Sequence, residues 1–295
     1  MNRTSIVILT VVTGGLGVGL HVPTLAALAA APAPAPAASL VAQPATAPTC
    51  ARDRVMLIGH RGMGPDTRTW HGTTYSEDTV EAFRAAVRVG ADGFETDFWP
   101  TADGEVVSHH DGTLDRMTAE TGTIGSRTAV EVAGLRNDSQ AHVPTFRETL
   151  DALVPAHPRV RVQQEFKDGR LFSDALLLEL ARIDREYVAD VDAQVLVTAS
   201  TVRLLERFHR LAPDLPLGLI DRSSGRPRLS SMPSWVDVVL IELGAADATY
   251  VRRAAARGHE VSLRKVDTVA QLREAVRLGA TRVVTDRPEV LGRAC

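Results

Sequence analysis

The chain has 295 residues and a formal net charge of −3, with acids and bases scattered along its length. This distribution excludes a basic stripe for a nucleic-acid backbone and a polybasic membrane patch, so we expect a small soluble partner and no nucleic acid. The length allows one large domain or two ordinary ones, and a barrel of alternating strands and helices uses about 250 residues as a single unit. The oligomeric state stays open.

The N-terminal region has the features of an export signal. Met1-Asn2-Arg3 precede an apolar run over 6–22, and an Ala-rich stretch with several small-x-small cleavage sites follows. We interpret residues 1–38 as a signal peptide with its Ala/Pro-rich segment, and residues 39–49 as a disordered linker. The folded domain then covers residues 50–295. We expect a secreted protein with no stable membrane span once mature, an uncleaved anchor being the alternative.

The two cysteines, Cys50 and Cys295, stand at the two ends of the expected domain. Export leads to an oxidising compartment, where disulfides persist. In a closed barrel the first strand lies beside the last strand and helix, so the two ends of the domain come close together. We therefore expect a disulfide between Cys50 and Cys295, and two free terminal thiols are the alternative.

Beyond Cys50, short apolar runs alternate with longer segments of helical periodicity, which predicts βα units and a largely parallel sheet. The fold class is therefore α/β, as a (β/α)8 TIM barrel. The expected strands are 55–59, 93–98, 106–109, 160–165, 195–198, 217–220, 236–241, 261–263 and 282–285. The clearest helices are 79–89, 171–185, 201–211, 248–257 and 269–278. Nine strands are one too many for an eight-stranded barrel, and the sequence does not say which one lies outside it.

Ionisable residues gather after the expected strands, at the end of a barrel where the active site is built. His60 and Arg61 follow the first strand directly, with glycines close by. Glu95 and Asp97 stand two residues apart on one strand and so point to the same face. Two such carboxylates repel each other unless a cation lies between them, and a set of oxygen ligands suits Ca²⁺ or Mg²⁺ better than zinc.

Two further strand ends carry similar groups. Because successive side chains of a strand point to opposite faces, only one of His109 and His110 can point toward the barrel mouth. Asp111 follows them. Glu165 and Lys167 repeat the two-residue spacing, and Lys167 is one of only two lysines in an arginine-rich chain. A retained lysine indicates that a compact ammonium is needed there. Each fragment alone is explained as well by a strand-end ion pair or a solvated turn, but their shared location favours a site.

In this order, the motifs resemble those of the glycerophosphodiester phosphodiesterase family, a phospholipase-C-like TIM-barrel group, over residues 58–288. The matching elements are H-R-G at 60–62, an E-N-T-like element at 77–79, the E-x-D pair Glu95 and Asp97, H-D at 110–111, the E-x-K pair Glu165 and Lys167, and T-D-R-P at 285–288. The segment 111–124 is also similar to the family segment that follows H-D.

The resemblance implies a metal-dependent hydrolysis of glycerophosphodiesters to glycerol 3-phosphate and an alcohol. It assigns a divalent cation, Ca²⁺ or Mg²⁺, to Glu95, Asp97 and Glu165. It assigns the substrate phosphate to Arg61 and Lys167, and acid–base catalysis to His60 and His110. It further implies that the glycerol hydroxyl beside the ester attacks phosphorus, and that water then opens the cyclic phosphate.

Three features depart from the family pattern. Asp78 replaces the common Asn, which we expect to add a negative charge, and the loop 62–76 is longer than in many members. That loop carries Trp70, His71 and Tyr75. Leu263-Arg264 stand in the region of the family's late Trp, which leaves the head group open. The alternatives are a sphingomyelinase D-like or phosphatidylinositol phospholipase-like barrel acting on another phospholipid diester, or a non-catalytic exported binding protein.

Overall fold

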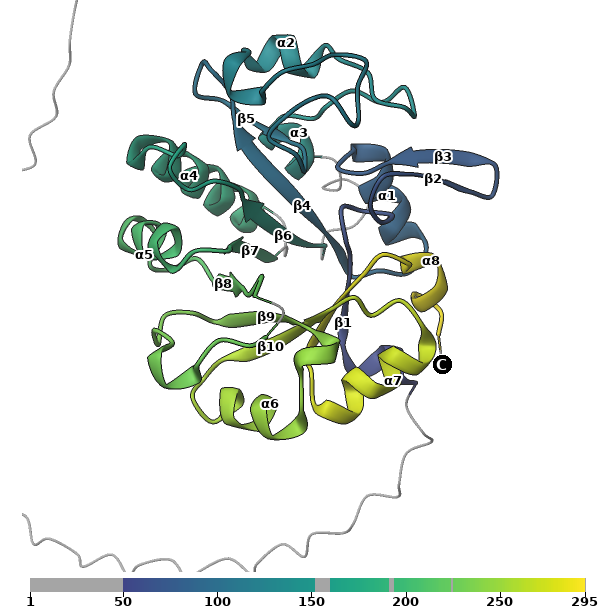
Figure 1. The fold of residues 1–295 in the computed structure, drawn as a ribbon, viewed down its shortest axis with the longest axis vertical. Helices are drawn as coiled ribbons and strands as arrows, with labels where there is room; N and C mark the ends of the chain where they lie inside the picture. Colours follow the sequence, from purple (N-terminus) through teal and green to yellow (C-terminus); the bar gives the residue numbers. More distant parts are fainter. Residues whose placement is uncertain (1–49, 152–159, 191–193, 224, 295) are drawn as a thin grey trace, which may run out of the picture. The chain divides into compact units, whose positions relative to one another are not determined.

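The computed structural model describes residues 50–151, 160–190, 194–223 and 225–294. Within these ranges eight parallel strands close into a barrel (Figure 1): β1 (Met56–Gly59), β4 (Gly93–Pro100), β6 (Arg161–Phe166), β7 (Gln194–Ala199), β8 (Leu217–Ile220), β9 (Val238–Glu242), β10 (Glu260–Arg264) and β11 (Arg282–Thr285). Strand β1 pairs with β11 on one side and with β4 on the other, which closes the ring. The expected (β/α)8 TIM barrel is confirmed.

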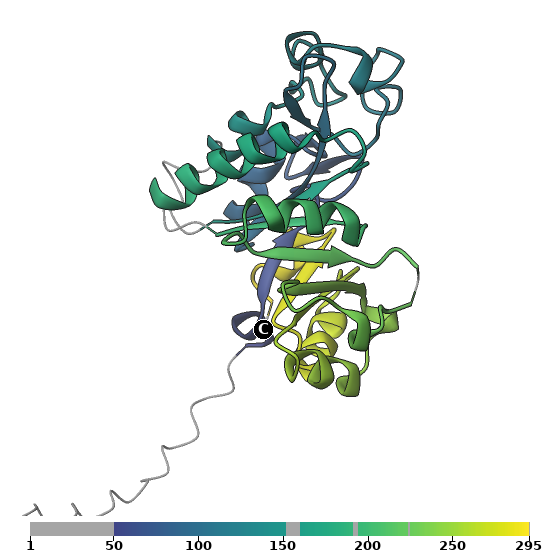
Figure 2. The ribbon, with the colours of Figure 1, turned by 90° about the vertical axis from the view of Figure 1, so that its left-hand side faces the viewer.

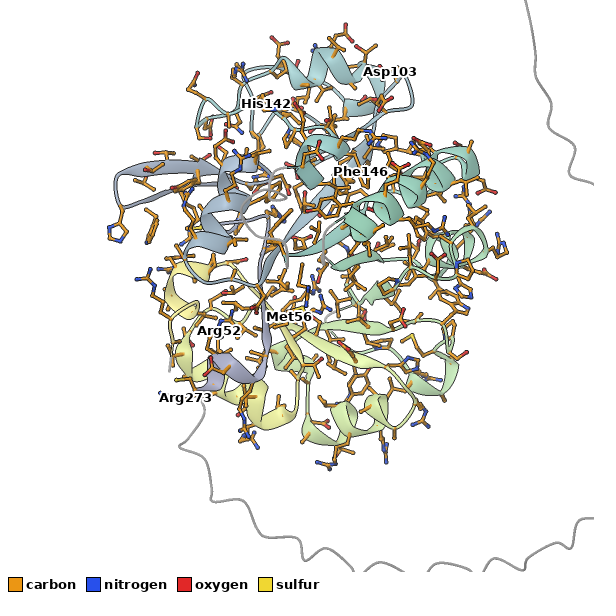
Figure 3. The ribbon with its side chains drawn as sticks, turned by 180° about the vertical axis from the view of Figure 1, so that it is seen from behind. Arg52, Met56, Asp103, His142, Phe146 and Arg273 are labelled. Atoms are coloured by element: carbon orange, nitrogen blue, oxygen red, sulfur yellow. The ribbon has the colours of Figure 1, made fainter. Side chains whose placement is uncertain are left out.

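The extra strand candidate is β5 (Val106–Ser108), which lies outside the parallel ring. It pairs antiparallel with β4, whose last residues extend beyond the barrel, and places Val107 opposite Trp99. An insertion follows, with the short helix α2 (Ala129–Ala133), and leads into α3 (Phe146–Asp151). Figure 3 labels Asp103, between β4 and β5, and His142, in the insertion, at the other end of the view from Arg273 of α7 (Val269–Leu278).

Helices cover the outside of the barrel: α1 (Val80–Arg88), α4 (Asp174–Asp190), α5 (Val202–Leu211), α6 (Ala248–Ala255), α7 (Val269–Leu278) and α8 (Pro288–Leu291). Figure 1 shows them around the ring of strands, and Figure 2 shows α4 and α5 from their outer side. The expected helix starts at Thr79 and Thr201 are one residue early, because these threonines are N-caps. Helix α4 begins at Asp174, three residues after its expected start at Leu171.

The loop 62–76 contains a hairpin that the sequence patterns did not predict. Strands β2 (Thr67–Trp70) and β3 (Thr73–Ser76) pair antiparallel and are joined by His71 and Gly72, both with positive φ. The hairpin returns the chain to the barrel, where the Glu77 amide donates to the Asp66 carbonyl at 2.9 Å. It thereby fixes the start of the segment that leads through Glu77 and Asp78 into α1.

Apolar packing separates the outer layer from the inside of the barrel. Two large clusters fill the space between strands and helices, and a small one lies inside the ring: Leu196, Ile220, Val238 and Leu240. Its members come from three neighbouring strands, β7, β8 and β9. The polar side chains that follow it on the same strands are therefore directed to the mouth.

None of the helices in the described ranges is both long and apolar enough to cross a membrane. The proposed signal peptide and linker, 1–49, lie outside the described residues, and so does Cys295. The predicted export and the predicted pairing of Cys50 with Cys295 stay predictions.

Candidate active site

Three carboxylates meet at the mouth of the barrel. Glu95 and Asp97 come from β4, and the strand register sets Asp97 directly opposite Glu165 of β6. One oxygen of each residue lies within 4.8 Å of the other two, and all three side chains are buried. Period-two alternation explains the arrangement, since Glu95 and Asp97 share the inner face of one strand.

The charges in this carboxylate group are only partly balanced. The Lys167 ammonium lies 2.7 Å from Asp97 and 3.3 Å from Glu165. Burial acts to raise the pKa of Asp97, but the charges of Lys167 and Arg61 outweigh it and lower this pKa to about 2. Burial and the neighbouring charge of Asp97 raise the pKa of Glu95 to about 7. The charges of His60 and Lys167 act in the opposite direction but offset only part of this rise. An oxygen-only group of this kind suits a divalent cation.

Arg61 is held against the same acids. Its backbone adopts a φ of 48°, and its amide donates to Glu95 at 3.1 Å. Its guanidinium donates to Glu77 at 2.9 Å, and its Nε lies 3.3 Å from Asp97. Because Glu77, Asp97 and Arg61 are nearly buried, this guanidinium is fixed at the floor of the mouth.

His60 lies between two carboxylates. Its Nδ1 is 2.6 Å from Asp286, the first residue after β11, and its Nε2 is 3.8 Å from Glu95. Burial acts to lower the pKa of His60, but the hydrogen bond with Asp286 and the charge of Glu95 outweigh it and raise this pKa. Since β1 and β11 are neighbours in the ring, the fold itself brings the T-D-R-P segment to the H-R-G histidine.

Of the two adjacent histidines, His110 is the more accessible. His109 is buried, and its Nδ1 lies 2.9 Å from the Asp111 carbonyl. The Nδ1 of His110 lies 2.7 Å from the Asp111 carboxylate, and its side chain is 27% exposed. Burial lowers the pKa of His110, so its neutral form is favoured near neutral pH, in contrast to His60.

Three residues at the site were given no role from the sequence: Arg116, Arg222 and Asp286. Asp286 does lie in the T-D-R-P motif, and Arg116 lies in the segment 111–124. Arg116 donates to Asp111 and to Asp66 at 2.6 Å each, and also to the buried Glu77. Arg116 thus connects Asp111, the partner of His110, with Glu77, the partner of Arg61. Arg222 and Asp286 each come within two residues of a strand end, so the strand-end rule could have identified both. Arg116 lies in the insertion after β5 and offered no such signal.

Asp78 does not behave as the expected extra charge. It is buried with a φ of 54°, and its Oδ1 accepts from the Asp97 amide at 3.3 Å. Burial and the charges of Asp97 and Glu77 raise its pKa well above the usual value. The neutral carboxyl is therefore favoured, and it presents the backbone with the same acceptor as the amide that the family commonly has here.

Known proteins resemble this chain over most of its length. The model of the glycerophosphoryl diester phosphodiesterase family matches residues 60–290. The glycerophosphodiester phosphodiesterase of Caldanaerobacter subterraneus is 24% identical over 252 residues, which cover 81% of this chain and 96% of that protein. Glycerophosphodiester phosphodiesterase 1 of Bos taurus is 38% identical over 108 residues, covering 34% of this chain and 30% of that protein.

The fold is shared with a solved phosphodiesterase of Oleispira antarctica in complex with the product sn-glycerol-3-phosphate. The two chains superpose with a TM-score of 0.65 at 20% identity, over 81% of this chain and 96% of the other. The family model spans every residue of the site described above. The chain thus belongs to the glycerophosphoryl diester phosphodiesterase family and is an enzyme of the phosphodiesterase class.

Proposed function

We propose that this protein hydrolyses glycerophosphodiesters to glycerol 3-phosphate and an alcohol, with a divalent cation and two catalytic histidines. The observation that carries the proposal is the meeting of Glu95, Asp97 and Glu165 within 4.8 Å at the barrel mouth, with His60 beside them. The family assignment and the oxygen-only character of these ligands support a hard cation such as Ca²⁺ or Mg²⁺.

Glu95, Asp97 and Glu165 would hold the cation. When bound, such an ion neutralises charge on the phosphoryl oxygens. Arg61 and Lys167, already fixed against Asp97, would hold the remaining phosphate oxygens by charge-assisted hydrogen bonds. The substrate phosphate would then be oriented by groups that come from three different strand ends.

The histidines would move the protons. His110, whose neutral form is favoured, would accept the proton of the attacking glycerol hydroxyl as its oxygen bonds to phosphorus. His60, whose charged form is favoured by Asp286, would give its proton to the oxygen of the departing alcohol as the P–O bond breaks. With the roles reversed, water would open the cyclic phosphate to glycerol 3-phosphate.

The direct test is release of glycerol 3-phosphate from glycerophosphocholine, with and without a chelator, by wild type, His60→Ala and His110→Ala. We expect chelator-sensitive turnover that falls at least about 100-fold in each variant. His142→Ala is the matched control, because His142 lies in the insertion and its side chain lies 3.4 Å from the exposed Glu148. Turnover that survives both the chelator and the two substitutions would refute the mechanism.

We also propose that the protein is exported and closed by a Cys50–Cys295 disulfide. The N-terminal sequence pattern supports export, and the absence of a free cysteine among the described residues supports the bridge. Mass spectrometry of protein secreted by its own host, with and without reductant, tests both proposals. The expected product starts after the Ala-rich segment and gains the mass of two hydrogen atoms on reduction, whereas a full-length or fully reduced chain would contradict the two proposals.

A further inference from the structure

One side of the barrel mouth carries arginines to which the proposed reaction gives no role. Outward-facing residues of β8, β9 and β10, such as Leu219, Ile241 and Leu263, pack against the helices. Ile220 and Leu240 belong to the cluster inside the barrel. Side chains two residues apart share a face, so the next inward-facing positions on these strands lie at the mouth. Those positions are Arg222, Glu242 and Arg264. We refer to these three residues, with Asp221, as the wall of the mouth.

Arg222 extends from the end of β8 to the carboxylate group. It forms an ion pair with Glu165, while its side chain stays 48% exposed. A guanidinium has five N–H donors in a planar fork, and this contact uses one nitrogen. Arg222 is therefore placed to touch Glu165 and a bound molecule together.

Arg264 supports the same wall from β10. Its guanidinium donates to the Asp221 carbonyl at 2.9 Å, across the intervening strand β9. Its Nε is buried and has no hydrogen-bond partner in the described part of the chain. Arg264 thus fixes the residue that precedes Arg222, and it keeps a donor unused.

The acids of this wall have partners in the protein, although Asp221 uses only its Oδ1, and its Oδ2 is buried without a partner in the described part of the chain. Glu242 lies 2.7 Å from Lys265, and the Asp221 carboxylate accepts from the amide and the hydroxyl of Ser223. Glu165 is shared between Lys167 and Arg222. The wall therefore offers guanidinium donors for a further anion.

Arg222, Glu242 and Arg264 offer no aromatic face for a quaternary ammonium. A quaternary ammonium is bound by aromatic faces, and the three tryptophans of the chain have other contacts. Trp70 packs on His71 of the hairpin, Trp99 donates to the His110 carbonyl, and Trp235 stacks on His209.

We propose that Arg222 and Arg264 form a subsite for an anionic group on the departing alcohol, so that the preferred substrates carry a second phosphate or a similar charge. The proposal rests on the glycerophosphodiesterase function proposed above and specifies its substrate class. Guanidinium forks bind phosphate oxygens with good geometry, which supports Arg over Lys at this wall.

The test compares glycerophosphoinositol with glycerophosphoinositol 4-phosphate, which differ only by one phosphate on the alcohol. We expect wild type to favour the phosphorylated diester about tenfold in kcat/KM, mainly through KM. Arg222→Gln and Arg264→Gln should each bring that ratio close to one, and Arg222→Lys should restore part of it. Arg203→Gln, an exposed arginine of α5, is the control and should leave the ratio unchanged.

A wild-type ratio of one or less, or a ratio unaffected by Arg222→Gln, would overturn the subsite while leaving the hydrolase function intact. Failure of the function itself gives a different result: folded wild-type protein would then cleave neither inositol diester nor glycerophosphocholine. A loss of ratio in Arg264→Gln alone would also contradict the proposal, since Arg222 would then make no contact with the second phosphate.

Discussion

The Nδ1 atom of His60 lies 2.6 Å from the carboxylate of Asp286, although 226 positions separate the two residues in the chain. The pairing of β1 with β11 brings them together at the point where the barrel closes. A carboxylate on Nδ1 fixes the ring orientation and leaves Nε2 for proton transfer, and it favours the charged imidazolium. Asp286 is therefore a positioning residue for the proposed acid.

Asp286→Asn should lower kcat about 10- to 100-fold, a part of the 10²- to 10⁴-fold that a general acid contributes, with KM little changed. The reason is that a neutral amide no longer favours the imidazolium. Steady-state kinetics on glycerophosphocholine measure the effect, with the exposed Asp115→Asn as the control. A kcat within twofold of wild type would show that Asp286 has no part in catalysis.

Asp78→Asn should be tolerated. The amide keeps the acceptor for the Asp97 backbone, avoids any buried charge, and suits a residue with a φ of 54°. We expect kcat/KM within about threefold of wild type and equal or higher stability in urea unfolding, because one hydrogen bond changes by about 1 kcal/mol or less.

Asp78→Ala is the companion variant to Asp78→Asn. It removes the acceptor and strains the left-handed backbone, and it should cost about 1–3 kcal/mol of unfolding free energy. If Asn destabilises the protein as much as Ala, the ionised carboxylate is needed and the neutral form is not the native one.

A second buried acid controls stability rather than catalysis. Asp184 of α4 is fully buried, and burial raises its pKa to about 7. Its Oδ1 accepts from the Gln164 amide at 2.8 Å, while its Oδ2 and the Gln164 Oε1 are both buried without a partner. An asparagine at 184 would supply the missing donor and complete the pair.

The pH dependence of this effect has a definite sign. An acid whose pKa is higher in the folded state destabilises the fold as pH rises from its unfolded value near 4 to about 7. Asp184→Asn should therefore unfold at about the same urea concentration as wild type at pH 4, and its unfolding free energy should exceed that of wild type by on the order of 4 kcal/mol at pH 8.

Asp214→Asn serves as the control for Asp184→Asn. Its carboxylate is exposed and paired with Arg185, so removing the charge should give no gain in stability at either pH. If Asp184→Asn changes stability equally at both pH values, Asp184 is not protonated in the folded state.

The sequence alone was sufficient for the barrel because its signals are local. Eight apolar runs with β-branched residues became the ring, and alternation placed Glu95 and Asp97 on one face. The extra strand was undetermined because β5 has the same apolar pattern as the ring strands. Only its antiparallel pairing with the end of β4 distinguishes it.

The polar side chains at the site were harder to predict than the fold. Strand-end positions identified the carboxylates and His60, but pairings such as Arg116 with Glu77 depend on where an irregular insertion returns to the barrel. The ionisation of Asp78 was misjudged because a sequence shows the acid and hides its burial. The hairpin at Thr67–Ser76 was missed because its strands are polar and little buried.

The central claim is that Glu95, Asp97 and Glu165 hold the cation on which hydrolysis depends. The most direct measurement is a calcium titration of metal-stripped protein by calorimetry, with glycerol 3-phosphate release from glycerophosphocholine assayed at each point, for wild type and Asp97→Asn. The account predicts one site per chain, activity that rises with occupancy, and at least about tenfold weaker binding in the variant. Full turnover by metal-free protein, or equal calcium binding by Asp97→Asn, would contradict it.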